Sequence, residues 1–282
     1  MKNTDFISRE KECIGTVVQI KLPDSALFPL CFDEIKRIES KYSRFIENSQ
    51  LSLLNSNLNK WIEVDDEFLM LLRKALEYKE NTKGNFDITI KDTLDRLGYD
   101  SKYSFKEKKG MEKIFDEPVL IKKNKVMIKS QIDFGGFGKG YALDRISELL
   151  EEKGAKEYYI NAGGDIVAHG NWAILLEHPD DASRAFGTVL LNGAIAGSAA
   201  NRRRWENSHH LINSSTRLPQ NSNKAVFVIT EHGMDADAYA TAIFTAGFSD
   251  GIEISKSLPI EVLITSSQNK VYKSKGFNVS YL

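Results

Sequence analysis

The chain has 282 residues, of which 41% are hydrophobic and 27% charged, and its formal net charge at pH 7 is −1. A globular protein of this size can bury a core without disulfides, and the neutral charge balance argues against a nucleic-acid-binding protein, which is usually clearly basic. No apolar run approaches the ~20 residues of a membrane span. The polar start, Met1 to Lys11, lacks the apolar stretch of a signal peptide. If no leader has been removed, the sequence predicts a cytoplasmic protein.

The first half of the chain predicts a strand, two helices and a hairpin. β-Branched residues alternate with other types in the opening segment, which favours a strand, and apolar residues then recur at helical spacing in two segments. Asp65 is typical of a helix N-cap, Gly84 of a helix end and Asn124 of a hairpin turn. In chain order, the predicted elements are a strand at 15–22, a helix from Phe32 to Phe45, a helix from Asp65 to Gly84, and a hairpin of strands 119–122 and 125–129.

The second half begins with a glycine loop, residues 135–140, which leads into a helix ending at Gly154. Strands dominate afterwards, interrupted by a helix of small residues at 236–246. The predicted strands are residues 158–161, 166–168, 173–177, 188–195, 225–230, 261–265, 271–273 and 277–281. We therefore predict a single domain over residues 1–282, of the α/β (α+β) class. Mixed and antiparallel strands would form two central layers, with helices packed outside.

The strongest local signal is the glycine loop, Asp133-Phe134-Gly135-Gly136-Phe137-Gly138-Lys139-Gly140. Its four glycines allow a backbone to approach a ligand closely, and the following helix N-terminus suits a phosphate. Lys139 adds a positive charge at the same end. The spacing matches neither a Walker A loop nor the G-x-G-x-x-G fingerprint. A tight strand-to-helix turn without a ligand is the alternative interpretation.

Two further motifs have both a functional and a structural interpretation. The segment Asn161-Ala162-Gly163-Gly164-Asp165 predicts a hairpin turn that Asp165 merely caps, or a turn whose backbone meets a ligand. His209 and His210 are neighbours at the start of an apolar run, so in a strand they would point to opposite faces. We therefore expect that the two do not share one metal, and that one of them can face a site and transfer protons.

Asp237 and Thr241 are four residues apart on a predicted helix, so their side chains share one face. A carboxylate and a hydroxyl are oxygen ligands that suit Mg²⁺. The alternative is that Asp235 caps the helix and Thr241 packs internally. The basic run Arg202-Arg203-Arg204 predicts a solvated turn, with a phosphate or partner contact as the alternative.

Together, the order and spacing of these motifs resemble the ApbE family of FAD:protein FMN transferases. The resemblance extends from about Gly15 to Gly247. The matching segments are Gly15-Thr16, Phe45 with Ser49-Gln50-Leu51-Ser52-Leu53-Leu54-Asn55, Phe86-Asp87-Ile88-Thr89, Asp133 through Asp144, and Asn161 through Asp165.

The resemblance implies an enzyme that transfers FMN from FAD to a Thr or Ser hydroxyl of a target flavoprotein. The product would be a phosphodiester, AMP would be released, and Mg²⁺ would be required. The FAD-binding residues that it implies are Phe45, Asp87, Ile88, Thr89, Asp133, Lys139 and Ile212. The metal ligands that it implies are Asp237, Thr241 and a backbone oxygen of Gly136. The implied catalytic residues are His210 and Lys139. Nothing in the sequence indicates an oligomeric state.

The sequence departs from the family pattern around His210. Gly197-Ser198-Ala199 stands where the family has Thr-Ser-Gly, and Asn213-Ser214 stands where it has Asp-Pro. Arg217 replaces the glycine of Thr-Gly-x-Pro, which predicts a different loop because that glycine permits a positive φ. Two alternatives to the transferase therefore stay open: an FAD-binding protein without transferase activity, and a metal-dependent FAD pyrophosphatase.

Overall fold

The computed structural model describes residues 5–108, 110, 114–201, 203–205 and 208–282. Its centre is a nine-stranded sheet in the order β1-β2-β6-β7-β8-β13-β14-β15, with β16 paired to β8. All the strand pairs found in the described residues are antiparallel. The strands of this sheet are β1 (Ile7–Cys13), β2 (Thr16–Leu22), β6 (Tyr158–Ala162), β7 (Asp165–His178), β8 (Asp181–Ala199), β13 (Asn223–Thr230), β14 (Glu261–Ser266), β15 (Val271–Lys273) and β16 (Val279–Tyr281).

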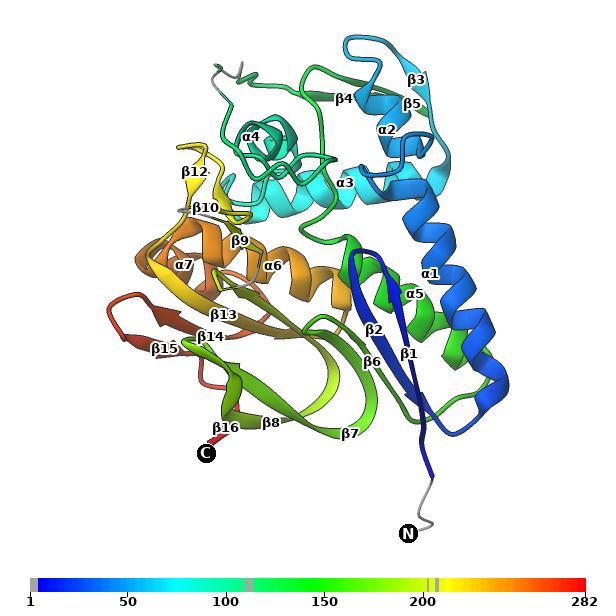
Figure 1. Ribbon diagram of the computed structural model, residues 1–282, viewed down its shortest axis with the longest axis vertical. Coiled ribbons are helices and arrows are strands. Elements are labelled where there is room, and N and C mark those ends of the chain that lie inside the picture. Colours follow the sequence, from blue (N-terminus) through cyan, green and yellow to red (C-terminus); the bar gives the residue numbers. More distant parts are fainter. Residues whose placement is uncertain (1–4, 109, 111–113, 202, 206–207) are drawn as a thin grey trace.

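Helices cover one face of the large sheet, and the curled β7–β8 hairpin lies on the other side (Figure 1). The helices are α1 (Phe28–Tyr42), α2 (Gln50–Asn55), α3 (Asp66–Asn81), α4 (Lys91–Arg96), α5 (Gly138–Glu152), α6 (Gly233–Ala246) and α7 (Phe248–Lys256), with 3-10 turns η1 (Ser25–Leu27) and η2 (Ile88–Ile90). Short strands form three small sheets: β3 (Ile62–Glu63), β5 (Lys125–Ile128) and β4 (Val119–Lys122); β9 (Arg204–Trp205) and β10 (Ser208–His209); β11 (Ile212–Asn213) and β12 (Leu218–Pro219). Among the described residues, no helix combines the length and apolar character that a membrane crossing needs.

The main core lies between the helices and the sheet, and α6 is its most buried helix. Alanines and other small side chains let α6 pack closely against β8 and β13. A second core lies on the opposite face, where Ile174 and Leu176 of the hairpin pack with Ile166 and Ile195 of the sheet. The second strand layer is therefore the far part of one hairpin that folds back over its own sheet.

The structure confirms the α+β class, the antiparallel strands and the helices packed outside. It also confirms Asp65 as an N-cap, because its carboxylate accepts the Phe68 backbone N–H at 2.9 Å. The strands predicted at 166–168 and 173–177 are one strand, β7. Its glycine, Gly170, has a φ of 100° and lies in a bulge that bends the strand without ending it.

The first predicted helix ends earlier than expected. α1 stops at Tyr42 because Ser43 is extended, with a ψ of 125°. Phe45 therefore lies outside the helix, in the connection to α2. Its ring therefore does not belong to the core that the buried side chains of α1 help to form.

The start of α6 is capped from another helix. Asp144 of α5 accepts the backbone N–H groups of Gly233 at 2.5 Å and Met234 at 2.8 Å. Asp235, the cap suggested by the sequence, instead accepts the Tyr78 hydroxyl at 2.5 Å. The two helices also touch at Gly140, where a Cβ atom would overlap the carbonyl oxygen of Gly233. The starts of α5 and α6 are thus joined.

Replacement of Asp144 by alanine is expected to lower the free energy of unfolding by about 2 kcal/mol, because the α6 N-terminus loses its acceptor. Asp144→Asn keeps one acceptor oxygen and is the matched control.

Burial raises the pKa of Asp144 to about 6, above its value of about 4 in an unfolded chain. The folded state therefore binds a proton at the Asp144 carboxyl more tightly than the unfolded state does. Protonation of this group thus raises the free energy of unfolding as the pH falls from 7 towards 4. Urea unfolding of wild type and Asp144→Asn should diverge in that range; a pH-independent difference would contradict the assignment.

Candidate functional site

A cavity of about 350 Å³ lies between the glycine loop, the start of α6 and the β6–β7 turn. We call it the central cavity. Most residues predicted to form the site line it. These are Phe45, Asp133, Gly136, Lys139, His210, Asp237 and Thr241. Segments from distant parts of the chain therefore converge on one place.

A buried charge cluster forms the floor of the central cavity. The Lys139 Nζ lies 2.5 Å from Asp165 Oδ2 and 3.2 Å from Asp237 Oδ2. The Asp165 and Asp237 side chains are only 5% and 6% exposed. Asp237 also accepts the Gly140 backbone N–H at 3.2 Å. Two buried carboxylates thus share one ammonium group, which leaves the cluster with a net negative charge.

The pKa values reflect this crowding. Burial raises the pKa of Asp165 to about 6; the Asp237 charge adds to the rise and Lys139 opposes it. Burial alone lowers the pKa of Lys139, but Asp165 and Asp237 outweigh it and hold the pKa above its ordinary value. Lys139 is therefore protonated at neutral pH, and the cluster favours an additional cation.

Asp165 is a site residue that the sequence interpretation missed, because it was read as the cap of a hairpin turn. Gly163 and Gly164, with φ values of 66° and 106°, form that turn between β6 and β7. A Cβ atom at Gly163 would overlap the Thr16 hydroxyl, so the turn packs directly on β2. The sequence feature that could have identified Asp165 is its position, an acidic residue directly after a turn of two glycines.

The candidate metal ligands lie together beside this cluster. Thr241 is one turn after Asp237 on α6, and its hydroxyl oxygen lies 3.5 Å from the carbonyl oxygen of Gly136. A carboxylate, a hydroxyl and a carbonyl are the oxygen donors that suit Mg²⁺. The described residues contain no group of three or more His, Cys, Asp or Glu side chains that could hold a metal. A metal at this place would be held by different kinds of oxygen donor: the Asp237 carboxylate, the Thr241 hydroxyl and the Gly136 carbonyl.

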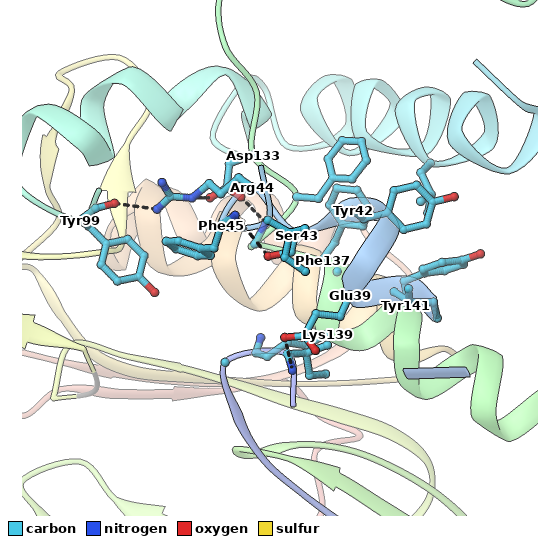
Figure 2. A pocket seen from close by; sticks show the side chains of 18 of the residues that line it. Glu39, Tyr42, Ser43, Arg44, Phe45, Tyr99, Asp133, Phe137, Lys139 and Tyr141 are labelled. Carbon is cyan, nitrogen blue, oxygen red and sulfur yellow. Dashed lines mark hydrogen bonds and ion pairs between the residues drawn. The ribbon is translucent and has the colours of Figure 1, made fainter. Parts of the chain in front are cut away.

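Arg44, which the sequence interpretation also missed, organises a neighbouring pocket of about 220 Å³. We call it the arginine pocket. In Figure 2 Arg44 lies between Tyr99 and Asp133, with Phe45 beside it. Its guanidinium donates to the Tyr99 carbonyl at 2.7 Å and pairs with Asp95 at 2.8 Å and Asp133 at 3.3 Å. The buried guanidinium thereby holds the Asp133 carboxylate at the junction with the central cavity.

Phe45 forms an aromatic wall at the mouth of the arginine pocket. Its ring lies 4.3 Å from the Arg44 guanidinium carbon and stacks on Tyr103, with centroids 5.2 Å apart and planes at 14°. The Phe45 residue is 37% exposed. Arg44 and Tyr103 therefore both pack on the Phe45 ring, and the part of the residue that stays exposed can contact a ligand.

A cavity of about 30 Å³ lies behind the central cavity and is lined by Asp87, Ile88, His210 and Ile212. Thr89 stands next to it rather than in its wall. The Thr89 backbone N–H and hydroxyl donate to Asp87 Oδ1 at 2.8 and 2.7 Å. Asp87 Oδ2 is paired with Lys79 Nζ at 3.0 Å. Thr89 therefore positions the Asp87 carboxylate.

The two histidines point in different directions, as predicted. The His209 ring packs against Phe244 with centroids 6.0 Å apart, and its Nδ1 accepts the Leu211 backbone N–H at 3.2 Å. His210 lines the central cavity, and within the described residues no hydrogen-bond partner is found for its buried Nδ1. Burial, followed by the charge of Arg203, lowers the pKa of His210 to about 3. The imidazole is therefore neutral at physiological pH.

The departures around His210 have local explanations. The Asn213 side chain accepts the backbone N–H groups of Ser215 and Thr216 and donates to the Thr245 carbonyl, so it shapes its own turn. Arg217 keeps a positive φ of 55° even though it is not glycine. Its guanidinium donates to the Thr89 carbonyl at 3.1 Å. That contact offsets backbone strain and ties the loop to the site.

Two of the three arginines in the basic run belong to the described residues; Arg202 lies outside them. Arg203 donates to the Gly15 carbonyl at 3.4 Å and lines both the central cavity and the arginine pocket. Arg204 is exposed in β9. The phosphate-contact interpretation is thus available to Arg203. The predicted turn is wrong for Arg204, which is solvated as expected but lies in a strand that pairs with β10.

Comparisons with known proteins agree with this arrangement. The model of the ApbE family matches residues 14–264. The FAD:protein FMN transferase of Haemophilus influenzae is 24% identical, over 98% of this chain and 91% of its own length. The ApbE protein of Thermotoga maritima has a TM-score of 0.90 at 26% identity, covering 97% of this chain and 98% of that one. The flavin transferase ApbE of Vibrio cholerae has a TM-score of 0.82 at 22% identity, covering 97% and 98%.

Proposed function

This chain belongs to the ApbE family, and from that premise we propose that it transfers FMN from FAD to a Thr or Ser hydroxyl of a target flavoprotein. The product is a phosphodiester, and AMP is released. The buried Asp165–Lys139–Asp237 cluster carries the proposal. Transfer of a phosphoryl-type group needs positioning and charge neutralisation more than covalent help from the protein. The cluster supplies the Lys139 ammonium group, and its net negative charge favours a divalent cation that would neutralise the diphosphate.

The central cavity is suited to the diphosphate of FAD. The start of α5 faces it at Lys139, and the positive end of this helix favours phosphate. Lys139 supplies a protonated ammonium group at the same helix end. Phe45 lines the cavity and can contact one ring system of the dinucleotide, while Ile88 and Ile212 offer apolar contact behind the cavity.

Asp237, Thr241 and the Gly136 carbonyl oxygen would hold Mg²⁺, since these donors converge and have the required chemistry. The bound metal supplies neutralisation of charge on phosphate oxygens. Asp133 is a further carboxylate of the cavity, besides Asp165 and Asp237; Arg44 pairs with it and keeps it in place.

His210 is the residue that we assign to proton transfer. As the acceptor hydroxyl oxygen bonds to the FMN phosphorus, the bond from phosphorus to the AMP oxygen breaks. The hydroxyl proton moves to Nδ1 of His210, and AMP leaves with the electron pair of the broken bond. His210 lines the central cavity, and no hydrogen-bond partner is found for its Nδ1 among the described residues, so this nitrogen is the one that we assign to accept the proton.

Replacement of His210 by alanine is expected to lower kcat for FMN transfer about a hundredfold, the usual contribution of a general base. The Kd for FAD, measured by flavin fluorescence, should stay within about threefold because the diphosphate contacts remain. His209→Ala serves as the control for losing a neighbouring imidazole. An unchanged kcat in His210→Ala would reject the assignment.

The function itself is tested by mixing the protein with FAD, Mg²⁺ and a flavin-free target flavoprotein, followed by intact-mass measurement of the target. A gain of one FMN on the target, with one AMP released, is the expected result. Release of FMN and AMP without a mass gain would favour the pyrophosphatase instead. Retention of FAD through gel filtration, without either product, would favour a flavin-binding protein.

A further inference from the structure

A groove of about 670 Å³ lies on the sheet face away from the helices, under the curled part of the β7–β8 hairpin. We call it the sheet groove. Its floor is made by alternate residues of several strands, which is the pattern of a sheet face. Representative floor residues are Gln19, Lys21, Tyr159, Asn161, Ile195 and Phe227.

The roof of the sheet groove is the edge of a strand. All of residues 172–177 line it, whereas a strand that presents its face contributes only every second residue. β8 pairs with this part of β7 on one edge, and β6 pairs with β7 only as far as His169. In the part of the chain that the structure describes, no strand pairs with the other edge of residues 172–177. Main-chain groups along this edge are therefore available to another strand.

The groove leads to the central cavity. Thr16, Gly163, Gly197, Ser198 and Ala199 line both, so the two spaces meet at the β6–β7 turn. The Lys139–Asp165 ion pair lies just inside this junction, because Asp165 directly follows the turn. A chain segment that lay along the groove would have its end beside the proposed diphosphate position.

We propose that the sheet groove binds the acceptor flavoprotein, through an extended segment that pairs with the open edge of β7 and carries the acceptor hydroxyl into the central cavity. This inference rests on the proposed function, which requires a macromolecular acceptor to reach the diphosphate. Strand addition supplies main-chain hydrogen bonds, and alternate side chains of the guest strand supply specificity. The exposed apolar side chains of Leu175 and Val17 provide contact area for the side chains of the guest strand.

The hairpin offers a matched pair of variants for the test. Leu175 lines the groove and is 66% exposed; Leu190, on the adjacent strand, is 69% exposed and is not among the groove's lining residues. Leu175→Asp and Leu190→Asp thus add the same charge to the same hairpin at positions of equal exposure. Neither side chain belongs to the proposed catalytic machinery, and neither change disturbs the core.

The measurement is the rate of FMN transfer against the concentration of a flavin-free acceptor, prepared from a flavoprotein that carries phosphodiester-linked FMN on threonine. Leu175→Asp is expected to raise the KM for the acceptor at least about tenfold, as loss of a central apolar contact does. Its kcat and its Kd for FAD should stay near wild type, and Leu190→Asp should behave as wild type. An unchanged KM in Leu175→Asp, or an equal rise in both variants, overturns the docking site but leaves the transferase intact.

A second readout separates this inference from the function. Amide hydrogen exchange at residues 172–177 should slow when the acceptor is added, because strand pairing protects main-chain N–H groups. If the wild type transfers no FMN, the proposed function fails. The docking site is then judged only by whether the acceptor slows amide exchange at residues 172–177. Absence of protection overturns it. Protection that depends only on the concentration of this chain would assign the edge to a second copy and overturn it as well.

Discussion

Asp237→Ala is expected to reduce FMN transfer on the order of a thousandfold, which is the usual scale for removing a group that stabilises developing charge in a transition state. The carboxylate holds Lys139, accepts the Gly140 backbone N–H and belongs to the proposed metal ligands. Steady-state transfer at saturating FAD and acceptor measures the effect. The affinity for FAD should also lose its dependence on Mg²⁺, which a purely structural role would not change.

Asp235→Asn is the matched control, since it removes the same charge two residues earlier on α6. Asp235 is bonded to the Tyr78 hydroxyl outside the central cavity, and the amide can still accept that bond. Its transfer rate should remain within a few-fold of wild type. Full activity in Asp237→Ala, with Mg²⁺-dependent FAD binding retained, would refute the metal assignment.

Lys139→Met is expected to lower the free energy of unfolding by about 3 kcal/mol, because removing one partner leaves buried charges unpaired. Asp165 and Asp237 would then face each other without the ammonium group that now lies between them. FAD affinity should fall as well, since the diphosphate loses a cationic contact. Thermal and urea unfolding, together with fluorescence titration of FAD, measure these effects.

The double variant Lys139→Met, Asp165→Asn separates charge from packing. Removing one buried carboxylate along with the ammonium group should recover more than half of the lost stability, a coupling that a double-mutant cycle measures. Strictly additive losses would show that Lys139 stabilises the fold through packing rather than through the ion pair. FAD affinity should stay low in the double variant.

The elements that the sequence predicted best are those with local causes. The capped start of α3 follows from Asp65, and the shared face of Asp237 and Thr241 follows from their spacing on one helix. The different directions of His209 and His210 were also predicted, although only His209 lies in a strand, β10. In each case the interaction involves residues within one or two turns of each other, so the pattern is visible without the fold.

Other site residues could not be predicted because their partners are distant in the chain. Arg44 bonds to groups 51 and 55 positions away, and no local pattern marks such an arginine. Asp165 was misinterpreted because its turn is explained equally well by its glycines alone. The bend of β7 could not be predicted either. A glycine such as Gly170 can end a strand or form a bulge within it, and the local sequence does not distinguish the two.

The contact between the starts of α5 and α6 limits how this protein can be recombined with its relatives. Gly140 and Gly233 touch through their backbones, and Asp144 caps α6 from α5. A chimaera with a crossover between these helices would combine one parent's glycine loop with the other parent's Asp237 helix. Small differences in approach would then misplace the two carboxylates around Lys139. Residues 138–246 should therefore be exchanged as one block when family members are shuffled.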